Sequence, residues 1–151
     1  MQLTDAPLST TLPGTWELLS RVDVDAAGQP QEEPSLGSDP VALLFYDHAG
    51  HFAAQFMKRD RSNSHVTDVP IAGSNNTRAQ GGYDAYFGTY HVDDVAGAVT
   101  QRLTGALSRE SVGLEITRTM CVEDDHLTIM LQTSSPTGQS LTRTLKWKRV
   151  G

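Results

Sequence analysis

The feature that most constrains this chain is an alternation of apolar and polar residues that recurs from residue 15 to residue 150. A period of two places apolar side chains on one face of a β-strand, whereas a helix requires a period near 3.6. The segments that follow the pattern are rich in β-branched and aromatic residues, which favour sheets. They cover residues 15–25, 41–46, 51–58, 84–93, 98–105, 113–122, 126–133 and 140–150. We therefore expect an all-β protein with eight strands.

The connections between these segments alternate in length. Those at 47–50, 94–97 and 123–125 are tight and contain Asp, Glu or Gly, whereas those around 26–40, 59–83, 106–112 and 134–139 are longer on average. In an up-and-down sheet, successive connections lie at opposite ends. The tight turns therefore close one end, and the long loops surround the other. Eight strands in this order predict an antiparallel up-and-down β-barrel, wide enough for one small ligand, with a long loop over its open end.

The two ends of the chain also point to a closed barrel. Gly14-Thr15-Trp16 opens the first strand, and Trp147-Lys148-Arg149 lies in the last one. Both Trp16 and Arg149 fall at the end with the tight turns, so we expect them to form the structural floor of the barrel. Residues 1–12 are expected to form a flexible N-terminal arm, and residues 13–151 a single domain.

Charge and composition exclude several partners. The chain carries 12 Lys and Arg against 18 Asp and Glu, which gives a net charge of −6 and argues against nucleic acid or an anionic membrane as the partner. No apolar run is long enough to span a bilayer, and the first thirteen residues do not read as a secretory signal. The single Cys121 cannot form an internal disulfide. These features favour a cytoplasmic protein. They are compatible with a homodimer.

An ordered set of short motifs is similar to a known family. The set comprises Gly14-Thr15-Trp16, the segments 53–57, 59–61 and 85–90, Gly113-Leu114-Glu115, Arg118 and the closing segment 145–150. Over residues 13–150 it resembles the lipocalin-like domains of the calycin group, in particular a small cytoplasmic, bacterial-type branch whose activities are mostly unassigned. The resemblance implies a lipocalin-like barrel in which Arg149 packs across the ring of Trp16. It implies the fold more than the function.

Strict alternation along each strand assigns side chains to the barrel interior. In the strands 41–46, 51–58 and 84–93 both faces are apolar, so the assignment there is less direct. On 51–58 we favour Ala53, Gln55 and Met57 as inward. The inward face of 41–46 remains open, and on 84–93 both Tyr86/Tyr90 and Phe87/Thr89/His91 remain open. The other residues expected to face inward are Trp16, Leu18, Ser20, Val22, Val99, Gln101, Leu103, Leu114, Ile116, Arg118, Met120, Val122, Leu127, Ile129, Leu131, Leu141, Arg143, Leu145, Trp147 and Arg149.

An apolar interior with a few polar groups is typical of a site for a small molecule. We expect binding of a small hydrophobic metabolite, anionic if it meets an arginine, with contacts from Gln55, Met57, Phe87, Gln101, Arg118 and Arg143. A buried arginine needs a partner. For Arg118 that partner is either the backbone of a neighbouring strand or a rim acid, or else a ligand carboxylate, enolate or phenolate.

Two other functions are consistent with the same interior. The first is an isomerase, cyclase or dehydratase in which Arg118 or Arg143 stabilises an anion and His91, Tyr86 or Tyr90 transfers a proton. The second is an interaction domain whose barrel is filled by its own side chains. No metal-ligand spacing, phosphate-binding loop, dinucleotide fingerprint or nucleophile elbow occurs, so we expect neither a metal nor a cofactor.

The connection 59–83 is the other candidate for a functional role. It is about 25 residues long, whereas most connections in compact domains have about 4–6 residues. Loops of this length often act as lids over binding sites. Arg59, Arg61, Arg78 and Tyr83 are the lid residues expected to meet an acidic ligand. The alternative is a solvated loop whose arginines pair with nearby acids.

Overall fold

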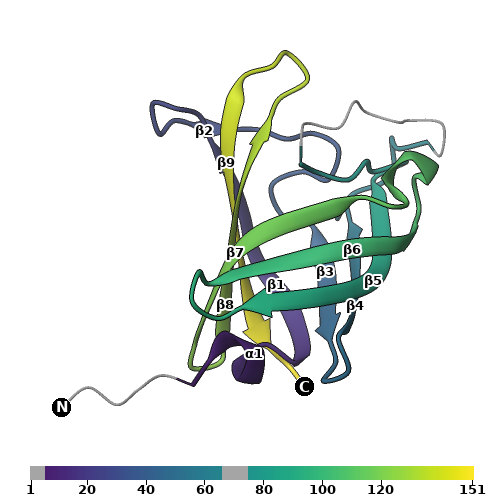
Figure 1. Ribbon diagram of the computed structural model, residues 1–151. Coiled ribbons are helices and arrows are strands. Elements are labelled where there is room, and N and C mark those ends of the chain that lie inside the picture. The colour runs from purple at the N-terminus through teal and green to yellow at the C-terminus, as the bar shows by residue number, and fades with distance from the viewer. Residues whose placement is uncertain (1–5, 66–74) are drawn as a thin grey trace.

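A single antiparallel sheet closes on itself in the computed structural model, which describes residues 6–65 and 75–151 (Figure 1). The strands follow the order β2-β1-β3-β4-β5-β6-β7-β8-β9, and β1 also pairs with β9, which closes the barrel. Their bounds are β1 Gly14–Val24, β2 Pro30–Gln31, β3 Val41–Tyr46, β4 His51–Met57, β5 Tyr83–Asp93, β6 Ala98–Ala106, β7 Glu115–Glu123, β8 His126–Ser134 and β9 Ser140–Arg149.

The eight-stranded barrel expected from the sequence is confirmed, because β2 contributes only two residues that pair with the end of β1. The short turns between β3 and β4, β5 and β6, and β7 and β8 lie at the lower end in Figure 1. The longer connections, which include the turn of 3₁₀ helix at Arg109–Ser111, lie at the upper end. Among the described residues, no helix is long and apolar enough to cross a membrane.

Trp16 and Arg149 form the floor of the barrel, as expected. Trp16 is fully buried, and the Arg149 guanidinium lies 4.3 Å from the centroid of its ring. Arg149 also donates hydrogen bonds to the backbone carbonyls of Thr11 and Pro13. A cation over an aromatic face stabilises both groups. The first and last strands are thereby joined at the point where the barrel closes.

Residues 8–12 differ from the expected flexible arm. They contain a short helix, α1 (Leu8–Thr11), and Leu12 is fully buried against the floor. Two interactions explain the difference: the Trp16 indole Nε1 donates to the Leu12 carbonyl at 2.9 Å, and the Ser9 backbone nitrogen and hydroxyl donate to the Asp94 carboxylate at 2.8 and 2.7 Å. The segment therefore seals the lower end of the barrel. Residues 1–5 lie outside the described residues.

A β-bulge in β1 overturns part of the expected interior. Leu18 lies opposite Trp147, but Ser20 lies opposite the next residue of β9, so Leu19 is an extra residue in the ladder. One extra residue reverses which face the following side chains occupy. Val22, expected inside, is consequently 47% exposed. The inward positions beyond the bulge are held by Arg21 and Asp23, which are both buried.

The preferred face of β4 was wrong. Phe52, Ala54 and Phe56 point into the barrel, whereas Gln55 is exposed. Both faces of this strand are apolar, and the two aromatic rings bury more surface than Ala53, Gln55 and Met57 would. The ring of Phe56 lies edge-on to Trp147, with 5.8 Å between the centroids. The orientation of β4 is therefore set by aromatic packing across the lumen.

On β5, the structure places Tyr86 and Tyr90 inside and Phe87, Thr89 and His91 outside. Phe87 is 56% exposed, and its ring lies over Gly105 of β6, where a Cβ atom would come within 2.3 Å of the ring. An outward aromatic side chain that covers a glycine in the neighbouring strand protects the backbone there. This packing accounts for the outward position of an aromatic residue on β5.

Candidate ligand-binding site

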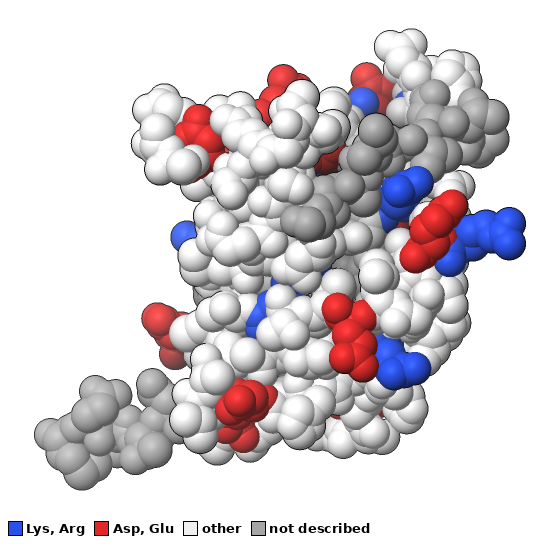
Figure 2. All heavy atoms as spheres, turned by 45° about the horizontal axis from the view of Figure 1, so that its top comes forward, with Lys and Arg blue, Asp and Glu red and all other residues white. Residues whose placement is uncertain are grey.

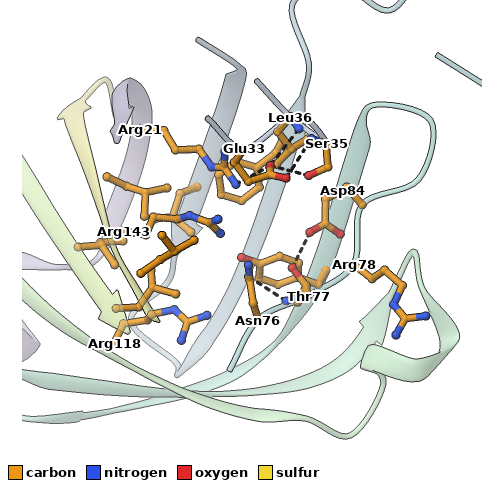
Figure 3. Close-up of a pocket in the computed structure, with 18 of the residues that line it drawn as sticks. Arg21, Glu33, Ser35, Leu36, Asn76, Thr77, Arg78, Asp84, Arg118 and Arg143 are labelled. Carbon is orange, nitrogen blue, oxygen red and sulfur yellow. Dashed lines mark hydrogen bonds and ion pairs between the residues drawn. The ribbon is translucent and has the colours of Figure 1, made fainter. Parts of the chain in front are cut away.

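A cavity of about 160 Å³ lies inside the barrel beneath the longer connections (Figure 3). Its apolar wall comes mainly from β3, β4, β8 and β9. Segments 32–36, 76–79 and 134–136 surround it at the upper end. The residues of the strands that line it are Arg21, Leu44, Tyr46, Phe56, Asp84, Tyr86, Gln101, Arg118, Ile129, Leu131, Ser134, Leu141, Arg143, Leu145 and Trp147.

Arg143 faces the cavity as expected, but it has a carboxylate partner of its own. Its Nε and Nη2 atoms donate to the two carboxylate oxygens of Asp23 at 2.7 and 2.9 Å, and both residues are buried. The two residues lie opposite each other on β9 and β1. A bidentate pair of this kind satisfies both charges internally. Asp23 could not be predicted as an inward residue, because the bulge precedes it.

Arg21 is a second buried arginine with a carboxylate partner. Its Nη2 atom lies 3.1 Å from Glu33 Oε1, and its Nη1 atom donates to the Gly37 carbonyl at 3.2 Å. Burial lowers the pKa of Arg21, and the charge of Arg143 adds to this effect. Burial alone would raise the pKa of Glu33, but Arg21 and hydrogen bonds from Ser35 outweigh it and lower that pKa. The loop between β2 and β3 thus contributes an acid to the mouth of the barrel.

Arg118 is buried like the other two arginines, yet it forms no ion pair with any described residue. Its Nη2 atom donates to the backbone carbonyl of Asn75 at 2.8 Å, and its Nη1 atom donates to the carbonyl of Thr117 at 3.3 Å. Burial lowers the pKa of Arg118 because the charged form is poorly solvated there. The expected inward orientation is confirmed. The backbone carbonyls that Arg118 meets belong to a loop and to its own strand, however, and not to a neighbouring strand as expected.

Asp84 is a buried acid that the sequence reasoning missed. Its Oδ2 atom accepts a hydrogen bond from the Thr77 hydroxyl at 2.5 Å. Burial raises the pKa of Asp84, although the Thr77 hydroxyl, the Ala85 backbone nitrogen and the charge of Arg21 oppose the shift. The signal that could have found it is parity, since Asp84 lies two residues before Tyr86 and therefore on the same face of β5.

Two tyrosines and a glutamine add neutral polar groups. The Tyr46 hydroxyl donates to Gln101 Oε1, and Gln101 lies inside the barrel as expected. Tyr86 lines the cavity, where burial and the charge of Asp84 raise its pKa to about 12. Its hydroxyl forms no hydrogen bond within residues 6–65 and 75–151. The indole Nε1 of Trp147, deeper in the barrel, is likewise without a partner in this part of the chain.

Several expected site residues do not reach the cavity. Gln55, Met57, Phe87 and His91 lie on the outer face of the barrel. The inward face of β4 is opposite to the preferred one, and on β5 the structure adopts the Tyr86/Tyr90 alternative of the two that were left open. Tyr90 faces inward but lies near the floor, where its hydroxyl donates to the Asp47 carbonyl at 2.5 Å. Of the three proposed proton-transfer residues, only Tyr86 lines the cavity.

The expected lid residues are also dispersed. Arg59 pairs with Asp39 at 3.0 Å, and Arg61 donates to the Gly81 carbonyl at 2.9 Å while its guanidinium lies 5.7 Å from the Tyr83 ring. Arg78 lines the rim of the cavity, but its side chain points away from the interior in Figure 3. In Figure 2, which brings the upper end forward, acidic and basic side chains are scattered over the surface. Residues 66–74 of this connection lie outside the described residues.

Outside the cavity, the structure offers little reactive chemistry. Within the described ranges, no group of three or more His, Cys, Asp or Glu side chains is arranged to hold a metal ion. Cys121 is exposed on the outer face, with its sulfur 3.9 Å from Glu123 Oε1. The chemistry available to a ligand is therefore concentrated in the lumen.

An antiparallel up-and-down barrel with a closed floor and a cavity under its loops defines the class of calycin-type barrels. Within that class, residues 13–150 match the family model of a lipocalin-like domain, and the chain belongs to this family. No curated protein matches the chain. The family assignment is consistent with binding of a small molecule in the barrel.

Proposed function

We propose that the barrel binds a small, ring-sized hydrophobic anion in its lumen and that Arg118 is the anion-binding residue. The observation that carries the proposal is that Arg118 is buried without a carboxylate partner among the described residues. Arg21 and Arg143 each have a carboxylate partner, whereas within residues 6–65 and 75–151 the guanidinium of Arg118 meets only backbone carbonyls. A buried cation is stabilised much more strongly by an anion than by neutral acceptors.

The size of the cavity limits the ligand. An apolar protein cavity of about 150 Å³ holds one benzene molecule. The lumen has a volume of about 160 Å³ and is walled by Leu44, Phe56, Ile129 and Leu145 on its apolar side. These dimensions favour a single ring with a small charged substituent over a long fatty chain.

Calorimetric titration with benzoate and its neutral analogue benzamide tests the proposal. We expect benzoate to bind the wild-type protein and Arg118→Leu to weaken that binding at least about 10-fold, since a hydrogen bond to a charged group contributes about 1.5–3 kcal/mol. Arg118→Lys keeps the charge but not the planar fork, so its loss should be smaller. Native mass spectrometry of the purified protein would show directly whether an anion of this size copurifies.

The matched control is Arg102→Leu. Arg102 is also an arginine of the sheet, but it lies exposed on the outer face of β6 and pairs with Glu115 at 3.3 Å. The substitution removes the same charge from the protein without touching the lumen. Wild-type benzoate affinity in a folded Arg118→Leu variant would contradict the assignment, as would an equal loss in Arg102→Leu.

A second candidate function, isomerisation, cyclisation or dehydration of such an anion, is favoured by Asp84. This buried acid lines the same cavity as Arg118 and Tyr86. A raised pKa makes this carboxylate a stronger base toward a substrate proton, while Arg118 would stabilise an enolate. Recovery of cyclic keto-acid probes unchanged after long incubation with the protein would count against this candidate.

A further inference from the structure

Among the described residues, two buried charged groups of the lumen take part in no internal ion pair. Arg143 pairs with Asp23, and Arg21 pairs with Glu33. What remains is one buried cation, Arg118 on β7, and one buried acid, Asp84 on β5. Neither forms an ion pair with a described residue, and both line the cavity.

One short segment of the chain forms hydrogen bonds with both groups. The backbone carbonyl of Asn75 accepts from Arg118 Nη2 at 2.8 Å, and the hydroxyl of Thr77 donates to Asp84 Oδ2 at 2.5 Å. Figure 3 shows Asn76 and Thr77 between Arg118 and Asp84. The segment 75–77 therefore presents an acceptor oxygen to the arginine and a hydroxyl donor to the acid.

The spacing of these two contacts indicates the size of a ligand that could replace them. The Cα atoms of Asn75 and Thr77 are at most about 7 Å apart, so the two contacts lie within about the length of one substituted ring. A ligand that replaces both contacts needs an anionic oxygen and a hydroxyl at opposite ends of such a ring. The apolar wall contacts the ring itself.

We propose that the ligand is a hydroxy-substituted ring carboxylate, whose carboxylate binds Arg118 and whose hydroxyl donates to Asp84. This inference rests on the proposed function and adds Asp84 as the residue that determines specificity. A hydroxyl suits the site better than an ammonium group, because the group that Asp84 binds now is a hydroxyl. The charge of Arg21 also acts on Asp84 and would repel a second cation.

Three probes of similar size test the inference by calorimetry: benzoate, 4-methylbenzoate and 4-hydroxybenzoate. The methyl group fills the space of the hydroxyl without donating a hydrogen bond. We expect the wild-type protein to bind 4-hydroxybenzoate about 10-fold more tightly than 4-methylbenzoate, because a hydrogen bond to a charged acceptor is of that strength. Asp84→Asn removes the charge and should reduce the preference to about 3-fold or less.

Two further variants separate the role of Asp84 from general effects at the mouth. Glu32→Gln makes the same chemical change at an exposed residue of the cavity rim and should leave the preference unchanged. Thr77→Val is nearly isosteric, removes the competing hydroxyl and should increase the preference for 4-hydroxybenzoate. Both comparisons use ratios between probes, so a change in overall affinity does not disturb them.

The outcomes distinguish the two proposals. If the three anions bind the wild-type protein equally well, the proposed function stands and the role of Asp84 is overturned. If none of the three binds, both proposals are overturned. A preference for 4-hydroxybenzoate that survives in Asp84→Asn assigns the hydroxyl to another residue and also overturns the inference. The wild-type comparison needs no variant, so it holds even if a substitution at position 84 prevents folding.

Discussion

The polar groups at the floor of this barrel and those at its mouth differ in the partners that they find within the protein. At the floor, the Trp16 indole donates to Leu12, and Arg149 meets two carbonyls, an aromatic face and the Asp125 carboxylate at 3.8 Å. At the mouth, Arg118 has only carbonyl partners among the described residues, and Asp84 forms no ion pair with any of them. The polar groups of the floor are satisfied by the protein itself, whereas Arg118 and Asp84 at the mouth lack an oppositely charged partner among the described residues.

The connections at the two ends also differ. The tight turn between β3 and β4, at the floor, is held by Asp47, whose carboxylate accepts from the backbone nitrogens of Ala49 and His51, and by Gly50 with a φ of 91°. Such turns form from neighbouring residues. At the mouth, the carbonyl that Arg118 meets belongs to Asn75, in the long connection between β4 and β5. A contact made through a long loop is one with which a ligand can compete.

The largest expected effect comes from Trp16→Ala at the floor. Trp16 is fully buried, and the substitution leaves a cavity and removes the aromatic face under Arg149. We expect a loss of about 3–5 kcal/mol in the free energy of unfolding, measured by urea denaturation. The affinity for benzoate of the folded fraction should not change. A large loss of affinity at unchanged stability would show that floor and mouth are not separate.

A smaller effect of about 3 kcal/mol is expected at the buried Asp23–Arg143 pair, which lies toward the mouth ends of β1 and β9. Asp23→Leu leaves the Arg143 guanidinium buried without its carboxylate, which is costly. The double variant Asp23→Leu/Arg143→Leu removes both charges and should recover most of the lost stability. Because Arg118 lacks such a partner, Arg118→Leu should reduce stability less than Asp23→Leu does. Equal losses in the two single variants would contradict the distinction between paired and unpaired arginines.

Particular residues show how much of this comparison could be predicted from sequence. On β6 to β9 one face of each strand is apolar, so the inward positions of Gln101, Arg118 and Arg143 follow from parity alone. On β1 the extra residue Leu19 reverses that parity, and no local sequence pattern predicts the bulge. On β4 and β5 both faces are apolar.

The partners of the inward groups were harder to predict than the groups themselves. Glu33 and Thr77 lie on loops and reach Arg21 and Asp84 through contacts that depend on the closed barrel. Loop side chains have no periodicity that would assign them to an interior. The barrel and the part of its lining that β6 to β9 contribute were therefore predictable from the sequence. The pairing of charges in the lumen could be determined only from the fold.

The smallest expected effect is a gain in stability from Asp84→Asn, and its dependence on pH sharpens the comparison. Burial raises the pKa of Asp84 above its ordinary value of 3.8, so the folded protein holds this proton more tightly than the unfolded chain does. The stability that the protonated group contributes is complete below about pH 3.8 and is lost as the pH rises through the folded pKa. Above that pKa, the wild-type protein carries a buried carboxylate that Asn replaces with a neutral amide.

We therefore expect Asp84→Asn to be more stable than the wild type by about 1 kcal/mol at neutral pH, near the lower end of the cost of a poorly satisfied buried group. The gain should disappear as the pH falls toward 3.8. Urea denaturation of both proteins across this range measures it. The floor provides the control, because the pKa of the exposed Asp94 is lowered by its hydrogen bonds from Ser9. Asp94→Asn should therefore change stability with the opposite sign, and a gain there would contradict the distinction between a satisfied floor and an unsatisfied mouth.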